Sequence, residues 1–164
     1  MYASAMEFLE EEHETWLPFE ALIDLSDADL DRPGHPNDAT HGWSARDLLG
    51  HLVAWQEQAL EVARELAVGE VSPSKRRMDD DWQARGDEIN DEFLVRWRAM
   101  DHDEVRRLAR TVPGELRGTL TMVPESRWVR NGDMMEFFFE ETIEHYQDHH
   151  DELAAILADP DRQP

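Results

Sequence analysis

Three histidines combine the residue type and the spacing that metal chemistry needs. His145 and His149 are four residues apart, so on a helix their side chains lie one turn apart on the same face and can reach one ion. The spacing alone is a weak signal, because such pairs are common. The surrounding pattern adds weight, since an inward imidazole needs a partner. His149 falls on an inner stripe with Met135, Phe138, Phe139, Thr142, Tyr146, Leu153 and Ile156, and His145 lies just beside it.

His51 is the third candidate. It lies one turn from both Leu48 and Trp55, along the edge of an apolar seam, and we expect it to face the core. Three imidazoles from two helices leave one or two coordination positions of a divalent ion open, as in sites where the ion acidifies water or a bound thiol. The chain has no cysteine, so histidines and carboxylates must supply the ligands. Candidates to orient the rings from behind are Glu141, Glu144 and Asp148.

The elements that must position these residues are helices, because all strong periodic signals have helical spacing and none alternates like a strand. A first helix is predicted over residues 3–25, with a break at Pro18. A second helix begins at Ser44, where Asp47 can complete a capping box, and ends at Gly69. The inner stripe predicted for the first helix is Met6, Leu9, His13, Trp16 and Leu17.

The second half of the chain predicts a polar surface crossover over residues 70–81, followed by a helical segment through Ile89, Phe93 and Trp97. A short helix over 105–112 is ended or bent by Pro113 and Gly114, and irregular chain follows. Asp133, with Glu136 at the capping-box distance, opens the last helix, which is expected to be the longest uninterrupted one. Together these segments predict an all-α, antiparallel four-helix bundle in one domain, 1–164, with a long crossover and an irregular segment before the last helix.

Charge and composition narrow the classes of partner. Sixteen basic against thirty-eight acidic side chains give a formal net charge of −22, which repels nucleic acid and anionic lipid. No apolar run reaches the roughly 18 residues of a membrane span, and the first residues lack a secretory pattern. We therefore expect a cytoplasmic protein that acts on a small molecule, with no nucleic-acid or membrane partner.

Two segments resemble motifs of a known family. Residues 42–52, which contain Trp43, Ser44, Asp47 and His51, are similar to the W-S-x-x-D-x-x-x-H-L signature of the DinB/YfiT-like superfamily, and residues 144–149 are similar to its closing E-H-x-x-x-H. The resemblance extends from residue 9 to residue 157. It implies a four-helix bundle, often dimeric, with a three-histidine site for a divalent metal such as zinc or nickel. By position the ligands are His51, His145 and His149.

The resemblance also implies chemistry, because the superfamily includes thiol-dependent S-transferases, a mycothiol-dependent isomerase and many proteins regarded as hydrolases. The first hypothesis is a metal-dependent enzyme in which the ion activates water or the sulfur of a low-molecular-weight thiol. The alternative is a non-catalytic, metal-stabilised bundle that is stress-related or binds a ligand. An open coordination position beside a pocket favours the enzyme, whereas a fourth protein ligand favours the alternative.

Other residues have weaker claims to a role. His13 lies on the predicted inner stripe and is kept in reserve, and His150 is turned away from its neighbour His149. Trp43 and Trp55 flank the metal helix and can wall a pocket, although ordinary packing is the favoured interpretation. Asp87 and Asn90 can reach across the bundle from the third helix. Residues expected in exposed connections are His35, His41 and His102.

Overall fold

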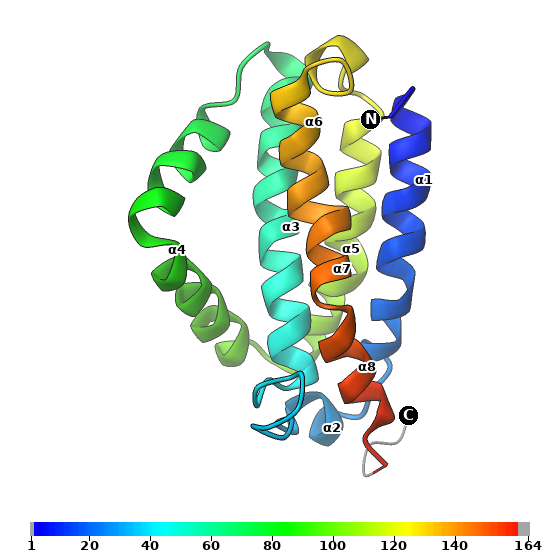
Figure 1. Ribbon diagram of the computed structural model, residues 1–164, viewed down its shortest axis with the longest axis vertical. Helices are drawn as coiled ribbons and strands as arrows, with labels where there is room; N and C mark the ends of the chain where they lie inside the picture. The colour runs from blue at the N-terminus through cyan, green and yellow to red at the C-terminus, as the bar shows by residue number, and fades with distance from the viewer. Residues whose placement is uncertain (1, 161–164) are drawn as a thin grey trace.

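The computed structural model describes residues 2–160, and within this range the protein is all-α. No strand forms in the described part, where one isolated bridge joins Pro33 to Ser44. The long helices run lengthwise, with α3 contacting α4, α5 and the last helical segment, and with α4 arching along one side (Figure 1). This arrangement confirms the predicted bundle. The main helices are α1 (Ala5–Trp16), α3 (Ala45–Val68), α4 (Pro73–Ala99), α5 (His102–Leu120), α6 (Gly132–Phe139), α7 (His145–Asp148) and α8 (His150–Ala158).

Helix α3 is the central element and matches its prediction closely. Ser44 caps it, and the capping box with Asp47 is complete, since each backbone N–H donates to the other residue's side chain at 3.1 Å. Arg98 at the end of α4 also donates to Asp47, at 2.7 and 3.0 Å, which fixes the start of α3. The predicted seam is fully buried and comprises Leu48, Leu52, Trp55, Ala59, Val62 and Leu66.

Helix α1 breaks where expected but exposes a different face. It ends at Trp16, and a 3₁₀ segment, η1 (Leu17–Leu22), follows with Pro18 in its first turn. Leu9 and Trp16 are buried as predicted, whereas the rest of the predicted stripe, which is Met6, His13 and Leu17, is exposed. The helix is rotated because Glu12 points inward with Phe8, where Arg117 and Tyr146 bind its carboxylate. A buried, paired carboxylate is invisible to an apolar count.

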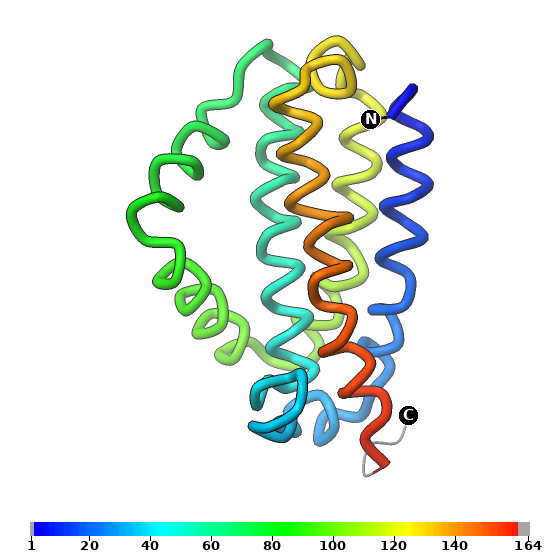
Figure 2. Tube along the Cα trace, in the orientation of Figure 1, coloured from blue at the N-terminus to red at the C-terminus, as the bar shows by residue number. Residues whose placement is uncertain are grey.

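Helix α4 corrects the prediction of a surface crossover over residues 70–81. The helix already begins at Pro73, capped by Ser72, and Pro is well suited to a first helical position. Glu65 of α3 accepts hydrogen bonds from Ser72 and Ser74 and so holds this start in place. The helix bends at Arg85, where the backbone leaves helical geometry (Figure 2). Most of α4 is exposed to solvent, so its sequence is largely polar and resembles that of a surface connection.

Helix α5 corrects the prediction that Pro113 and Gly114 end or bend a short helix. It starts at His102, passes through Pro113 and continues to Leu120. A proline removes one helical hydrogen bond, at a cost of about 3 kcal/mol. Burying two leucine side chains beyond it, Leu116 and Leu120, contributes roughly 1.5–3 kcal/mol each, which is enough to offset that cost. Packing therefore extends the helix past a sequence signal that would otherwise stop it.

The last helical segment differs from the single long helix that the sequence predicts. It begins at Gly132, capped by Asn131 rather than Asp133. A π-helical turn, η3 (Glu140–Glu144), interrupts it, and the backbone leaves helical geometry again at His149, with φ −98° and ψ 11°. Both α3 and α4 are longer. Of the predicted stripe, Met135, Phe138, Thr142, Tyr146, Leu153 and Ile156 are buried, while Phe139 and His149 are half-buried.

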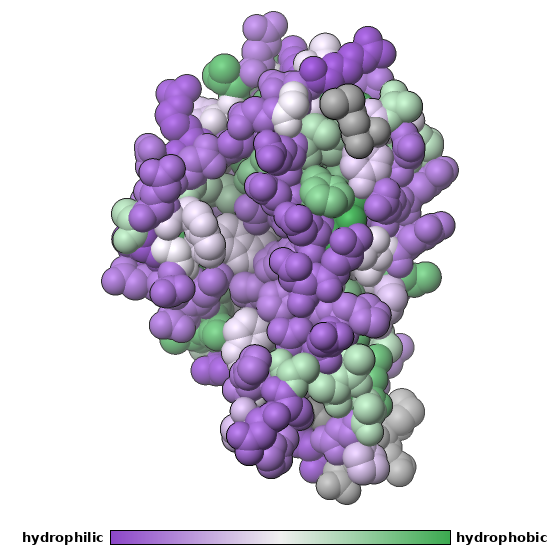
Figure 3. All heavy atoms as spheres, in the orientation of Figure 1, coloured by the Kyte–Doolittle hydropathy of each residue, from purple (hydrophilic) through white to green (hydrophobic). Residues whose placement is uncertain are grey.

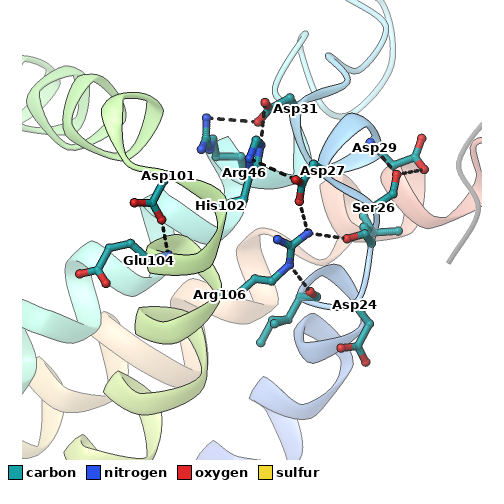
Figure 4. A network of polar contacts seen from close by, with 12 residues as sticks. Asp24, Ser26, Asp27, Asp29, Asp31, Arg46, Asp101, His102, Glu104 and Arg106 are labelled. Atoms are coloured by element: carbon teal, nitrogen blue, oxygen red, sulfur yellow. Dashed lines mark hydrogen bonds and ion pairs between the residues drawn. The ribbon is translucent and has the colours of Figure 1, made fainter.

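Ion pairs and hydrogen bonds anchor the connection that precedes α3 to the start of α5 (Figure 4). His102 Nε2 lies 2.9 Å from Asp31 and its Nδ1 lies 3.6 Å from Asp27, both in or beside the short helix α2 (Asp27–Asp31). Arg46 of α3 pairs with Asp31 at 3.2 Å, and Arg106 pairs with Asp27 at 2.7 Å. His102 is therefore half-buried and paired rather than exposed as predicted. These contacts fix the loop from which α3 and its histidine start.

The surface is dominated by hydrophilic side chains on the face shown in Figure 3, with paler, less polar atoms between α4 and the last helical segment. This matches the formal charge of −22. Within the described residues, none of the helices combines the length and the hydropathy that crossing a membrane requires.

Candidate metal centre

The fold brings the three predicted histidines together. His51 comes from α3, His145 starts α7, and His149 lies between α7 and α8. Their ring centroids are 4.7–5.0 Å apart. The Nε2 atoms of His51 and His145 face each other at 2.8 Å. Each of the three rings offers one nitrogen to a group whose atoms all lie within 4.8 Å of one another. We call these residues, His51, His145 and His149, the histidine cluster.

Burial sets the protonation of two members of the cluster. His51 is 5% exposed and His145 is half-buried. Burial, together with repulsion from neighbouring imidazoles, lowers the pKa of His51 to about 3 and that of His145 to about 2. Both rings are therefore neutral at neutral pH. A neutral imidazole has a free lone pair, which is the form that binds a metal.

His149 has supporting contacts that the sequence analysis did not identify. Its Nδ1 lies 3.2 Å from a carboxylate oxygen of Glu152, which leaves Nε2 for another partner. Trp43 stacks on the His149 ring at 5.8 Å and meets His51 edge-on at 5.1 Å. Glu152 is three residues beyond His149, a helical spacing that offered a usable signal. Two of the residues proposed for this role, Glu144 and Asp148, are instead exposed.

The loop before α3 gives Trp43 its position. Gly42 has φ +91°, a left-handed conformation that glycine adopts without steric cost, and His41 has φ 51°. The Trp43 amide then donates to the Thr40 carbonyl at 2.9 Å. This turn lays the indole over the histidine cluster. Trp43, for which packing was the favoured interpretation, is thus in contact with two of the three rings.

The cluster fits a divalent ion by the chemistry of its donors. Two ligand atoms on a tetrahedral zinc lie roughly 3.3 Å apart for zinc–nitrogen distances of about 2.0–2.1 Å, so the 2.8 Å between the facing Nε2 atoms needs only a small opening. The His149–Glu152 contact matches the carboxylate that commonly orients a metal-bound imidazole. Among the described residues, no fourth side chain joins the group. Three nitrogen donors leave at least one coordination position for another molecule.

A cavity of about 500 Å³ opens onto the cluster. It lies between α3, α4 and the last helical segment, and His51 and His145 form part of its wall. Trp55, for which the sequence allows either a pocket wall or ordinary packing, lines the cavity. Its Nε1 donates to Asn90 at 3.1 Å. Asn90 therefore reaches across the bundle as predicted. The remaining lining residues are Lys75, Met78, Asp79, Trp82, Asp133, Glu136, Phe137, Glu140 and Glu141.

Glu141, also a candidate to orient one of the rings, lines this cavity. Within the described residues, no hydrogen bond joins it to a histidine. It is half-buried in the π-helical turn, one turn before His145. Burial, together with the charges of Glu140 and Asp79, raises the pKa of its carboxyl to about 8. A carboxyl of this kind carries a proton at neutral pH. Such groups serve as acids and bases in active sites.

A second buried polar cluster lies beside the first. Tyr146 donates to Glu12 at 2.9 Å and accepts from Gln56 at 2.8 Å, and Arg117 pairs with Glu12 at 2.9 Å. One residue comes from each of α1, α3, α5 and α7, so the hydrogen bonds cross the whole bundle. We call this set the polar network; it consists of Glu12, Gln56, Arg117 and Tyr146. Sequence analysis placed Tyr146 on the inner stripe but did not identify its partners.

The other histidines stay outside the cluster. His13, kept in reserve, is exposed on α1. His150 is exposed, as its turn away from His149 predicts, and His35 and His41 are exposed as expected. Asp87 is also exposed on α4.

Comparison with known families agrees with the motifs and the geometry. A model of the DinB superfamily matches residues 13–148, which is most of the chain. The chain belongs to the DinB superfamily. The match contains His51 and His145 and stops one residue before His149, so the third histidine is supported by the closing sequence motif and by the geometry. No curated protein matches the chain.

Proposed function

We propose that this DinB-superfamily protein is a metal-dependent enzyme acting on a small molecule, with His51, His145 and His149 as ligands of one divalent ion. Neutral imidazoles suit zinc or nickel. When bound, such an ion would supply a Lewis acid that lowers the pKa of water or of a thiol at its open position. The geometry supports the starting point of this proposal, which is a group of three histidines in a helical bundle that can hold an ion.

The observation that carries the proposal is the cavity next to an incomplete ligand set. A structural zinc site is normally closed by a fourth protein ligand, whereas a catalytic site keeps a position open. Here the described residues provide three donors, and two of them line a cavity of about 500 Å³. This favours the enzyme over a non-catalytic, metal-stabilised bundle.

The chain's own residues have distinct roles in this proposal. Glu152 orients the His149 ring, and Trp43 shields the cluster from solvent on the side of the loop. Glu141, protonated at neutral pH, donates a proton to the leaving group and, once ionised, accepts the proton of the nucleophile. Asn90 holds the Trp55 indole in the cavity wall. These residues bind, orient and move a proton around the position where the substrate sits.

Two reaction classes fit this arrangement: hydrolysis, with water as the nucleophile, and transfer of the sulfur of a low-molecular-weight thiol to an electrophile. Both use the same open position. The carboxylates of the cavity wall repel anionic thiols, so a thiol substrate should be uncharged or cationic.

A cobalt-loaded protein tests the open position, because the visible spectrum of cobalt reports its ligands. We expect cysteamine and 2-mercaptoethanol to perturb the spectrum, 3-mercaptopropionate to do so more weakly, and a 4-nitrophenyl ester to be hydrolysed if water is the nucleophile. His145→Ala should abolish these signals, and His150→Ala, which changes an exposed histidine, should not. A spectrum that no thiol alters, without ester turnover, would mean a closed site and a structural ion.

Assembly and location are further parts of the proposal. We infer a homodimer and a cytoplasmic location, on the basis of the motif resemblance and the acidic sequence. Light scattering coupled to size-exclusion chromatography tests the first. A mass near 38 kDa, twice the 19.1 kDa of one chain, is the expected result.

A further inference from the structure

The cavity beside the histidine cluster is lined by more acidic than basic side chains. Five carboxylates line it, and Lys75 is the only lysine or arginine among its lining residues. One carboxylate comes from α4 and four come from α6 and the π-helical turn. The acidic wall is made of Asp79, Asp133, Glu136, Glu140 and Glu141. The excess of acidic over basic side chains in this lining is part of the net charge of −22 and is concentrated at the cavity.

Lys75 shows how this cavity accommodates a cation. Its ammonium lies 2.9 Å from Asp79 and 3.5 Å from Asp133, and 5.5 Å from the ring centroid of Phe137. The side chain is only 12% exposed. Burial opposes its charge, but the hydrogen bonds and charges of Asp79 and Asp133 raise the pKa of Lys75 overall. Two carboxylates and an aromatic face thus already hold one ammonium in the wall.

Three acidic groups of the wall have no such partner. The ion pairs of Lys75 are with Asp79 and Asp133, and no ion pair within the described residues reaches Glu136, Glu140 or Glu141. Glu141 is protonated at neutral pH, which leaves Glu136 and Glu140 as the two carboxylates that can meet a cation. Burial, together with the charges of neighbouring carboxylates, raises the pKa of Glu140, and a positively charged ligand would relieve the repulsive part of this effect.

Much of the remaining lining is apolar and aromatic. Trp55 and Trp82 meet edge to face at 5.3 Å, and Met78 and Phe137 also line the cavity. His51 and His145 form another part of the wall. A ligand that contacts the carboxylates, the aromatic side chains and the histidines needs a charged end, an apolar body and a polar end.

The helix gives the length of such a ligand. Glu136 precedes His145 by nine residues and Glu140 precedes it by five. At about 1.5 Å per residue these separations correspond to less than roughly 14 Å and roughly 8 Å along the helix axis, because the π-helical turn within the stretch rises less per residue. Glu141, one turn from His145, lies between them. The charged end and the histidine end of the cavity are therefore separated by the length of a small, extended organic molecule.

We propose that this cavity binds an elongated organic cation, with its ammonium group at Glu136 and Glu140, its apolar or aromatic body against Trp55 and Trp82, and its reacting end at the histidine cluster. The inference rests on the proposed function only for the reacting end. Recognition of the cation depends on the acidic wall, with or without catalysis.

Three probes of matched size test the cation preference: 4-phenylbutylamine, 4-phenylbutan-1-ol and 4-phenylbutanoate, titrated by calorimetry at pH 7.5 and moderate salt into the protein as purified. We expect the amine to bind about tenfold or more tightly than the alcohol, and the carboxylate to bind weakest. Replacing two carboxylates, in Glu136→Gln/Glu140→Gln, should weaken the amine about tenfold and leave the alcohol nearly unchanged.

The matched control is Glu14→Gln/Glu20→Gln, which removes the same charge from exposed positions outside the cavity. It should leave amine binding unchanged. The proposal is overturned if the alcohol binds as tightly as the amine, if no probe binds, or if the control weakens the amine as much as the cavity variant does. Because binding is read without turnover and repeated after treatment with a chelator, loss of the metal site gives a different result from loss of the cation site.

Discussion

Two polar clusters share the interior of this bundle and are completed in opposite ways. The polar network closes on itself across four helices, and only the Oε1 of Gln56 lacks a partner among the described residues. The histidine cluster, one residue away at His145, places neutral nitrogens against one another and opens onto a cavity. The histidine cluster therefore places nitrogen donors beside a space that a further ligand can enter.

The comparison also separates stability from function. The polar network joins the helices through hydrogen bonds that exist only in the folded bundle. The histidine cluster contributes less to holding the helices together, because the contact between the Nε2 atoms of His51 and His145 is the hydrogen bond that joins α3 to α7 within it. Variants in the two clusters should therefore fail in different assays, and four predictions use this difference.

The largest effect of a single substitution is expected in the polar network. Glu12→Ala leaves Arg117 and the Tyr146 hydroxyl without their common partner, so the free energy of unfolding should fall by roughly 3 kcal/mol or more. Urea unfolding followed by circular dichroism measures this change. Metal binding by the folded fraction should be unchanged, and a variant that lost metal while keeping its stability would invert the comparison.

The second prediction concerns pH and the metal-free protein. The pKa values of about 3 for His51 and about 2 for His145 lie below the ordinary imidazole value of 6.5, so between about pH 3 and 6.5 the unfolded chain binds more protons. Stability should therefore fall as the pH falls below 6.5, by roughly 2 kcal/mol per imidazole at pH 5. Urea unfolding with chelator at pH 7.5 and pH 5 measures it.

The matched variant for this prediction is His51→Gln/His145→Gln, which removes both imidazoles and keeps the carboxyl groups that titrate in the same range. Raised carboxyl pKa values, as at Glu12 and Glu141, act in the opposite direction and remain in both proteins. The variant should lose less stability on acidification than the natural sequence. Equal losses would show that the buried histidines are not the groups responsible.

The third prediction concerns the contact behind His149. Glu152→Gln removes the carboxylate that orients the ring, and metal affinity should fall roughly 10–100-fold with little change in unfolding free energy. Asp151→Asn changes an exposed neighbouring carboxylate and serves as the control. Competition with a metal indicator dye measures the affinity. Equal affinity in both variants would remove Glu152 from the account of the site.

The smallest effect is expected in the loop that carries Trp43. Gly42→Ala places a side chain at φ +91°, which should cost about 1 kcal/mol and shift the indole from the histidine cluster. Gly118→Ala is the control, since a methyl group there, inside α5, meets no atom within 4 Å and should be neutral or stabilising. Thermal unfolding and near-ultraviolet circular dichroism read the two effects. A neutral Gly42→Ala would show that the loop adapts.

The sequence predicts most of the fold from short-range periodicity, and it predicts the histidine cluster from helical spacing together with the resemblance to the DinB motifs. The seam of α3 and the break at Pro18 follow from helical spacing and helix-breaking or capping residues, and the motifs join His51 to His145 and His149. What the sequence does not predict depends on contacts between distant segments. The face that α1 buries is set by Glu12 meeting Arg117, and Pro113 stays within α5 because leucines beyond it are buried.

The cavity illustrates the same limit for the site. Its acidic wall joins α4 to the last helical segment, and no local pattern indicates that these polar stretches face each other. The regular helix assumed for His145 and His149 is also interrupted, by a π-helical turn before the pair and a change of backbone geometry at His149. The ligand positions are still close, since the backbone bond from His149 to His145 is kept at 3.3 Å.

The metal content of the purified protein and of three alanine variants tests the central claim most directly. After loading with zinc or nickel and removal of excess, plasma mass spectrometry should find one ion per chain in the natural sequence, in His13→Ala and in His150→Ala. His149→Ala should lose the ion while its far-ultraviolet circular dichroism stays helical, because apolar seams provide most of the burial. Full metal content in His149→Ala, or none in the natural sequence, would contradict the three-histidine site.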